Sequence, residues 1–205
     1  MITDLFVFDD ILNEKEIIDL NEYVKDSNIR WESLKDVVGN YSKKSEVHFF
    51  PAKVHPQPYC KNETINLLIE KIQKRICEKL DLQFVMNYRW KINWTTPLDN
   101  EYNPIHLLHY DRINEHLACV VYINNSTGDT FIYNNKFGDD ARNYENNYDE
   151  IDYSNYILKK NISPLAGRCV VFNGNLAHHG SYPVQGDRYI LNLNFVASKK
   201  IKSVI

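Results

Sequence analysis

The chain has 205 residues, of which 43% are hydrophobic and 25% charged, and its 24 Lys and Arg against 27 Asp and Glu leave a formal net charge of −3 at pH 7. These proportions are normal for one soluble globular domain. A net negative charge offers no global attraction to phosphate, so the composition argues against nucleic acid as a partner. No apolar run approaches the length of a membrane span, so we expect no membrane partner.

The N-terminal segment and the cysteines predict a compartment. The first residues, Met-Ile-Thr-Asp, are followed by neither the basic region nor the long apolar region of a signal peptide. Cys60, Cys77, Cys119 and Cys169 lie far apart, without a CxxC pair, which is typical of reduced thiols. We therefore expect a cytoplasmic protein, with Cys119 and Cys169 in the core because they lie in apolar runs.

Two helices are predicted in the first part of the chain, after a short strand at residues 5–8. Asn13 is a candidate N-cap with Glu16 three residues later, the pattern of a capping box, and the helix that follows extends to about Lys25. A longer helix is expected at residues 62–80. Its apolar residues recur at helical spacing: Ile65, Leu68, Ile69, Ile72 and Ile76. Both helices are expected to pack against a sheet.

Short strands separated by turn residues dominate the chain after residue 82. Many strands without intervening helices favour an antiparallel jelly-roll barrel. The predicted fold class is mainly β with flanking α: a double-stranded β-helix of the cupin-like kind at about 83–197, with helices from about 1–82 packed on one sheet. The expected strands are residues 84–94, 106–111, 118–123, 130–133, 169–172 and 189–196.

The stretch 134–156 differs from the rest of the chain. It is rich in Asn, Asp and Tyr and lacks apolar periodicity. We interpret it as a long inserted loop, and loops of this length are usually functional lids or disordered segments. Its length and composition motivate the hypothesis that it closes over a substrate.

His109 and Asp111 are the first candidate metal ligands. They are two residues apart, so on a strand both side chains would point to the same face. This spacing is common by chance, and its weight comes from His178 and Arg188 later in the chain. Two imidazoles and one carboxylate can occupy one face of an octahedral iron(II) ion and leave three positions open. An arginine can bind the far carboxylate of a co-substrate through two parallel hydrogen bonds.

The last strand carries an unusual polar face. Arg188, Ile190, Asn192 and Asn194 alternate along it and share one side. An ordinary core face does not hold one arginine and two asparagines, because buried polar groups need partners. The residues alone leave two interpretations: a polar cavity, or the solvent side of the sheet.

With these motifs in order, the sequence resembles the iron(II)- and 2-oxoglutarate-dependent oxygenases, in particular the prolyl-4-hydroxylase-like branch and its short phage and marine-bacterial members. The resemblance covers roughly residues 84–197. One departure is Asp129, which replaces the second glycine of the usual G-G-T turn. The matching positions are His109 with Asp111 (HxD), residues 121–124 with 128–130 (usually Y-L-N…G-G-T), Pro164 with Gly167 and Arg168, Phe172 with His178, and residues 186–189.

The resemblance implies a metal site and three cofactors or co-substrates: Fe(II), 2-oxoglutarate and O2. His109, Asp111 and His178 would bind the iron. The count from Phe172 and the ten-residue gap to the arginine favour His178 as the distal ligand, whereas a nine-residue gap, as in some relatives, would select the adjacent His179.

The resemblance also implies a co-substrate site. Arg188 would pair with the distal carboxylate of 2-oxoglutarate. Tyr122 occupies a position from which a tyrosine of the family often assists that arginine. Asn192 follows Arg188 by four residues, where the family often places another polar contact.

The other histidines carry no such motif. His106 differs in strand parity from His109, so we expect it to face elsewhere, as a polar-pocket or surface residue. His48, His55 and His116 are expected to be surface or structural residues.

The function implied is that of a single oxygenase domain, residues 1–205, that hydroxylates a C–H bond and releases succinate and CO2. By family likeness the first candidate substrate is a prolyl residue in a protein or peptide, and a free amino acid or other small molecule is an alternative. A nucleic-acid base would be signalled by a basic aromatic strip. Residues 87–94 have that character, but we interpret them as a strand whose Trp90, Ile92 and Trp94 share a face. Two further alternatives are a non-catalytic jelly-roll module and a metal-binding cupin enzyme that does not use 2-oxoglutarate.

Overall fold

The computed structural model describes residues 4–29, 31–34, 52–56, 62–97, 106, 108–111, 114–136 and 153–200. Within these ranges lie two helices, ten strands and a short 3-10 turn at Tyr153–Asn155. The helices are α1 (Glu14–Lys25) and α2 (Glu63–Lys79), and the strands are β1 (Phe6–Phe8), β2 (Glu32–Leu34), β3 (Ala52–Pro56), β4 (Leu82–Thr95), β5 (Leu117–Tyr122), β6 (Thr130–Lys136), β7 (Leu158–Ile162), β8 (Cys169–Asn173), β9 (Leu176–Gly180) and β10 (Arg188–Lys199).

Both predicted helices are confirmed, together with their N-caps. The Asn13 side chain accepts a hydrogen bond from the backbone N–H of Glu16, and the Glu16 carboxylate accepts one from the backbone N–H of Asn13, which completes the capping box. The Asn62 side chain accepts a hydrogen bond from the backbone N–H of Ile65. Each cap supplies a partner for N–H groups that have none inside the helix.

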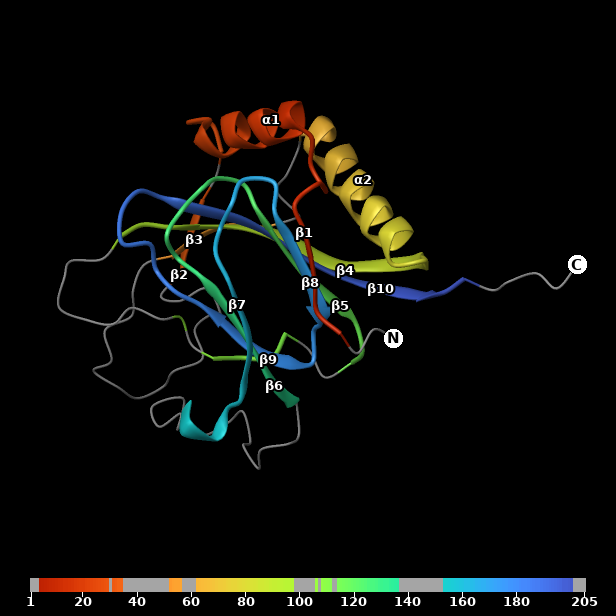
Figure 1. Ribbon diagram of the computed structural model, residues 1–205. Helices are drawn as coiled ribbons and strands as arrows, with labels where there is room; N and C mark the ends of the chain where they lie inside the picture. Colours follow the sequence, from red (N-terminus) through yellow and green to blue (C-terminus); the bar gives the residue numbers. More distant parts are fainter. Residues whose placement is uncertain are drawn as a thin grey trace, which may run out of the picture.

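The strands form two antiparallel sheets that face each other, so the predicted double-stranded β-helix is confirmed. In the described part of the chain, the larger sheet has seven strands in the order β1-β8-β5-β10-β4-β3-β2, and the smaller has three in the order β7-β6-β9. Figure 1 shows α1 and α2 covering one face of the larger sheet, with the smaller sheet on its other side.

Strand β5 explains why the larger sheet has two different buried faces. Leu117, Cys119 and Val121 belong to the apolar cluster that includes the helices, whereas Ala118, Val120 and Tyr122 belong to the cluster between the two sheets. Every residue of β5 is buried. Because side chains alternate along a strand, a slip of one residue in register would exchange the two sets, so this burial specifies the register strongly.

Strand β10 follows the same alternation and places its polar face inside the barrel. Leu191 and Leu193 pack in the helix-side cluster. Arg188 is 2% exposed and Asn194 1% exposed, on the side that faces the smaller sheet. The interpretation of this polar face as the solvent side of the sheet is therefore wrong.

Several strand predictions need correction. Residues 106–111 were expected to form a strand, but the described part of this stretch makes only an isolated bridge between His109 and His178. β7 and β9 were not predicted, because Leu-Lys-Lys-Asn-Ile and Leu-Ala-His-His-Gly lack alternating branched residues. Both strands form because they pair with β6.

The predicted loop 134–156 is shorter than expected at both ends, because β6 continues to Lys136 and Tyr153–Asn155 form the 3-10 turn. Residues 137–152 lie outside the described residues, and so does Cys60. Cys77, Cys119 and Cys169 are free and buried, as expected for the last two.

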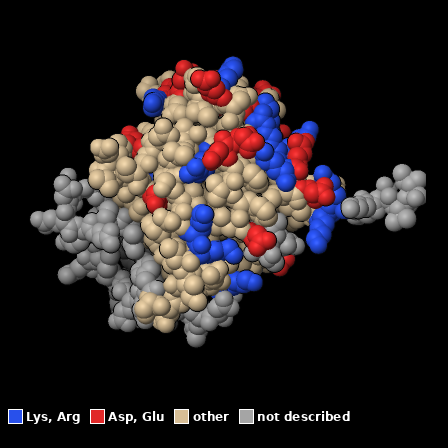
Figure 2. Space-filling model, in the orientation of Figure 1, with Lys and Arg blue, Asp and Glu red and all other residues tan. Residues whose placement is uncertain are grey.

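Acidic and basic side chains lie interspersed over the face of the molecule shown in Figure 2. No helix in the described ranges is long and apolar enough to cross a lipid bilayer.

Candidate metal and co-substrate site

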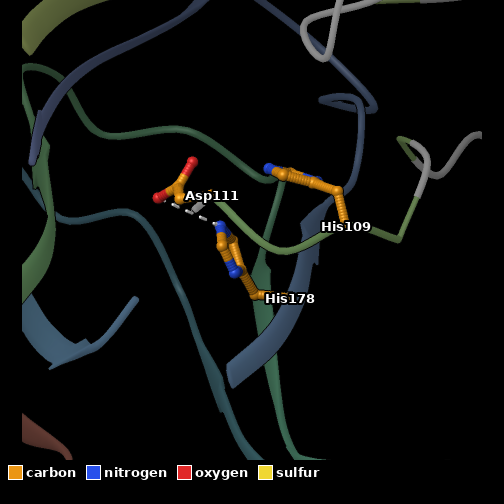
Figure 3. A group of neighbouring side chains, drawn as sticks. All are labelled: His109, Asp111 and His178. Carbon is orange, nitrogen blue, oxygen red and sulfur yellow. Dashed lines mark ion pairs between the residues drawn. The ribbon is translucent and has the colours of Figure 1, made fainter. Parts of the chain in front are cut away.

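The structure brings His109, Asp111 and His178 together. One ligand atom from each residue lies within 4.8 Å of the ligand atoms of the other two. Figure 3 shows the three side chains converging, with the His178 Nε2 atom 3.7 Å from Asp111 Oδ2. The backbones are joined as well: His109 N–H donates to His178 O over 3.0 Å, and His178 N–H donates to His109 O over 2.9 Å. This bridge connects the segment of the HxD pair to β9.

The adjacent histidines of β9 have different surroundings. His178 Nδ1 lies 2.9 Å from the carbonyl oxygen of Leu176. A carbonyl oxygen can only accept, so Nδ1 donates this hydrogen bond and Nε2 is the ring nitrogen directed toward Asp111. His179 instead has its Nε2 2.9 Å from the Tyr133 hydroxyl, and its ring stacks on Phe131 with centroids 4.9 Å apart.

Two donors from neighbouring strands hold the Asp111 carboxylate. Arg89 Nη2 donates to Oδ1 over 2.8 Å, and Asn194 Nδ2 donates to Oδ2 over 2.7 Å. Burial alone would raise the pKa of the Asp111 carboxyl, but the charges of His178, His109 and Arg89 and the hydrogen bond from Asn194 hold that pKa well below its usual range. Asp111 is therefore ionised at neutral pH, as a metal ligand must be.

The Arg188 guanidinium is buried at the other end of the same cavity. Its Nη2 donates to Thr130 Oγ1 over 3.0 Å, and the Tyr122 hydroxyl donates to the same oxygen over 2.7 Å. The Arg188 guanidinium carbon lies 5.8 Å from the centroid of the Tyr122 ring. Burial raises the pKa of Tyr122 to about 12, so the hydroxyl stays protonated and can donate.

Arg188 makes fewer hydrogen bonds and ion pairs with the described residues than its guanidinium group could form. Its Nε has no hydrogen-bond partner there, and no carboxylate of those residues forms an ion pair with it. Burial lowers the pKa of Arg188, but arginine remains charged at neutral pH. A buried positive charge without an ion-pair partner among those residues is costly, so an anion bound beside this guanidinium would stabilise it.

A single cavity of about 50 Å³ joins the two ends. Asn192 lines this cavity, four residues after Arg188 in the sequence. The lining residues are Lys91, Asn93, His106, His109, Asp111, Val120, Thr130, His178, His179, Gly180, Arg188, Ile190 and Asn192.

The prediction that His106 faces away from the site is wrong, although a polar-pocket residue was one of the two roles expected for it. His106 is 2% exposed, lines the cavity, and has its ring centroid 4.1 Å from that of Tyr182. Counting positions along a strand gave the wrong direction because the described residues of 106–111 form only an isolated bridge at His109. Burial, followed by the charge of Arg188, lowers the pKa of His106 well below its usual value, so the ring is neutral at pH 7.

The remaining histidines are His48, His55 and His116. His116 is fully buried and fills the space beside Gly174, which makes it structural, one of the two roles expected for it. His48 and the side chain of His55 lie outside the described part of the chain.

Sequence reasoning missed Arg89, Lys91 and Thr130. A signal for the first two was present: because Trp90, Ile92 and Trp94 share one face of β4, Arg89 and Lys91 must share the other. In the structure Arg89 pairs with Asn194 and Lys91 with Asn192, so the polar faces of β4 and β10 are adjacent. Thr130 is the first residue of β6, directly after Gly128 and Asp129, and only its contact with Arg188 reveals its role.

No protein-family model matches the sequence, and no curated protein matches it at a significant level. Solved structures do match. An oxidoreductase of the 2OG-Fe(II) oxygenase family from Burkholderia pseudomallei is 10% identical, with 96% of this chain and 86% of that one covered and a TM-score of 0.63. A Pseudomonas putida prolyl-4-hydroxylase is 13% identical, with 93% and 91% covered and a TM-score of 0.57.

A third similar structure is HygX from Streptomyces hygroscopicus, solved with nickel, 2-oxoglutarate and hygromycin B bound. It is 13% identical, with 97% of this chain and 84% of that one covered and a TM-score of 0.62. Matches over nearly the whole chain at such low identity establish the fold. The chain therefore has the fold of the 2-oxoglutarate- and iron(II)-dependent oxygenases of known structure, including prolyl-4-hydroxylases.

Proposed function

We propose that this chain is an iron(II)- and 2-oxoglutarate-dependent oxygenase that hydroxylates a substrate C–H bond and releases succinate and CO2. The observation that carries the proposal is one cavity with His109, Asp111 and His178 at one end and the buried Arg188 guanidinium at the other. A metal ion and a dicarboxylate are complementary to these two ends. The reaction and the cofactors come from the similarity in fold to proteins with that chemistry.

The three candidate ligands fit iron(II). Two imidazole nitrogens and one carboxylate oxygen form the donor set of non-haem iron oxygenases, which leaves coordination positions for co-substrate and oxygen. When bound, the iron would supply the activation of O2 that makes an unreactive C–H bond oxidisable. The chain's contribution is to orient the ligands: the Leu176 carbonyl selects the tautomer of His178, and Arg89 and Asn194 hold Asp111.

Arg188 fits the distal carboxylate of 2-oxoglutarate. A guanidinium can donate two parallel hydrogen bonds to a carboxylate, and Nε is available to serve as one donor. The Thr130 hydroxyl holds Nη2 and restricts the rotation of the guanidinium. The Tyr122 hydroxyl donates to the same Thr130 oxygen, and Asn192 offers a further polar group along the cavity wall.

We propose a prolyl residue in a protein or peptide as the first substrate to test, since one of the similar structures is a prolyl-4-hydroxylase. A free amino acid or another small molecule is the second candidate. A nucleic-acid base is disfavoured by the net charge of −3 and by the interspersed charges on the face shown in Figure 2.

Anaerobic titration tests the reaction class. Adding 2-oxoglutarate to the Fe(II)-loaded protein is expected to produce a metal-to-ligand charge-transfer absorption band, which disappears in Asp111→Ala. A non-catalytic jelly-roll module would bind no iron at this site. A metal-dependent cupin enzyme of another kind would bind iron but show no band with 2-oxoglutarate, and either result would refute the proposal.

Mass spectrometry identifies the substrate. Candidate peptides, amino acids and oligonucleotides would be incubated with Fe(II), 2-oxoglutarate and O2, and each product examined for a gain of one oxygen atom. Succinate should accumulate in proportion to that product. If a free amino acid gains the oxygen atom and the peptides do not, the proposal of a prolyl substrate is wrong, while the proposed reaction class still holds.

A further inference from the structure

Arg89, Asn194 and Asp111 form a closed set of hydrogen bonds beside the candidate metal site. Arg89 Nη2 donates to Asp111 Oδ1, Asn194 Nδ2 donates to Asp111 Oδ2, and Arg89 Nε donates to Asn194 Oδ1 over 2.8 Å. Arg89 lies on β4 and Asn194 on β10, directly opposite each other in the register. Each oxygen of the carboxylate therefore has one donor from a different strand.

The link between Arg89 and Asn194 fixes the orientation of both donors. Because Arg89 Nε can only donate, the oxygen of the Asn194 amide must face it, and the amide nitrogen must then face Asp111. The planar guanidinium is likewise aligned by its two acceptors. Rotation of either side chain would break two hydrogen bonds, so the carboxylate lies in a rigid frame on the sheet.

This frame bears on how the carboxylate can bind a metal. Each oxygen accepts one hydrogen bond, Oδ1 from Arg89 and Oδ2 from Asn194, and Oδ2 is the oxygen near His178, at 3.7 Å from Nε2. A carboxylate that gave both oxygens to one ion would have to rotate out of this frame. Single-oxygen binding leaves more coordination positions open for the co-substrate and O2.

We infer that Arg89 and Asn194 are positioning residues that hold Asp111 for binding of the metal through one oxygen. The inference rests on the proposed function, since it concerns the same metal site. Arg89 has two opposite effects on metal affinity. Its charge disfavours a nearby cation, whereas the fixed orientation of the Asp111 carboxylate favours metal binding. Loss of partners that orient a metal ligand typically weakens metal affinity by about 10- to 100-fold, so the geometric effect is expected to dominate.

Direct binding of Co(II), measured without oxygen, tests the inference. Arg89→Met is expected to weaken binding by about 10- to 100-fold and to change the d–d absorption spectrum, which reports the number and arrangement of ligands. Asn194→Ala should also weaken Co(II) binding and change the d–d spectrum, although it alters no charge. Arg89→Lys keeps the charge that disfavours a cation and cannot bridge to Asn194, so its affinity should fall at least as far as that of Arg89→Met.

Arg75 provides a matched control. It is an arginine with two hydrogen bonds to a buried carboxylate, that of Glu16, in the helical layer on the other side of the large sheet from the cavity. Arg75→Met should lower the melting temperature while Co(II) affinity and spectrum stay those of the parent.

The outcomes separate two failures. If the parent binds Co(II) no better than Asp111→Ala does, the proposed metal site is wrong. If the parent binds Co(II), but Asn194→Ala and Arg89→Lys bind it within twofold of the parent and with the same spectrum, the pair is merely structural and the positioning role is refuted. Arg89→Lys decides the matter if Arg89→Met does not fold.

Discussion

The Tyr133 hydroxyl lies 2.9 Å from His179 Nε2, on a different face of β9 from His178. Adjacent residues of a strand point to opposite sides, so His178 and His179 cannot both reach Asp111. His178 is opposite Ile132, a member of the cluster between the sheets, and His179 is opposite Phe131.

The two adjacent histidines are therefore expected to differ in their effect on metal binding. His178→Ala should abolish measurable binding of Fe(II) or Co(II), because only two protein ligands would remain. His179→Ala should retain the metal and lose some stability through the missing bond to Tyr133, by about 1 kcal/mol. Anaerobic calorimetric titration of both variants measures the difference, and the reverse order would identify His179 as the ligand.

Arg188 and Thr130 are expected to control the affinity for 2-oxoglutarate without changing that for the metal. Arg188→Gln removes a charge-assisted hydrogen bond worth about 1.5–3 kcal/mol, which corresponds to a roughly 10- to 150-fold higher dissociation constant. Thr130→Val removes one neutral bond to the guanidinium and should cost about fivefold. The charge-transfer band titrated with 2-oxoglutarate reports both values. An unchanged affinity in Arg188→Gln would place the co-substrate elsewhere.

Glu16 is expected to make stability depend on pH. Burial opposes ionisation of this carboxyl, but Arg75, Lys71 and the Asn13 backbone N–H lower its pKa from 4.5 to about 2. A depressed folded-state pKa contributes stability that is present above the unfolded value and is lost as the pH falls from about 4.5 to about 2.

We expect Glu16→Gln to lower the free energy of unfolding at pH 7 by about 1–3 kcal/mol, less than the full pKa shift implies because Lys71 is half exposed. The difference from the parent should shrink between pH 4.5 and pH 2. Urea unfolding at several pH values measures it. Asp19→Asn, which removes the exposed pair with Lys15, should change little at any pH, and a constant effect of Glu16→Gln would contradict the assignment.

A substitution at Gly174 is expected to disturb both the packing of the core and the position of Asp111 in the metal site. A Cβ at this position would overlap the buried ring of His116, and the Gly174 carbonyl accepts a hydrogen bond from the Asp111 backbone N–H over 3.3 Å. Gly174→Ala should therefore cost about 1–3 kcal/mol of stability and also weaken metal binding. Gly186→Ala is the control: its φ of +66° makes the substitution strained, but no atom lies within 4 Å of the new Cβ. It should lower stability alone, and equal metal affinity in both variants would exclude the coupling.

Strand β4 illustrates how far the pattern of side chains predicts the structure. The shared face of Trp90, Ile92 and Trp94 was predicted, and these residues pack in the helix-side cluster. The opposite face holds Arg89, Lys91 and Asn93, and alternation alone could have identified it. What it faces depends on the pairing with β10, which no local pattern specifies.

The capped helices, the alternating strands and the HxD pair follow from the order of residues, because caps, side-chain periodicity and turns depend on neighbours a few positions apart. The proximity of His178 to Asp111, the burial of His106 and the contact of Arg89 with Asp111 depend on strand pairing between distant segments. These contacts arise from packing and hydrogen bonding in three dimensions, and a change of one residue in register would remove them while leaving every local pattern intact.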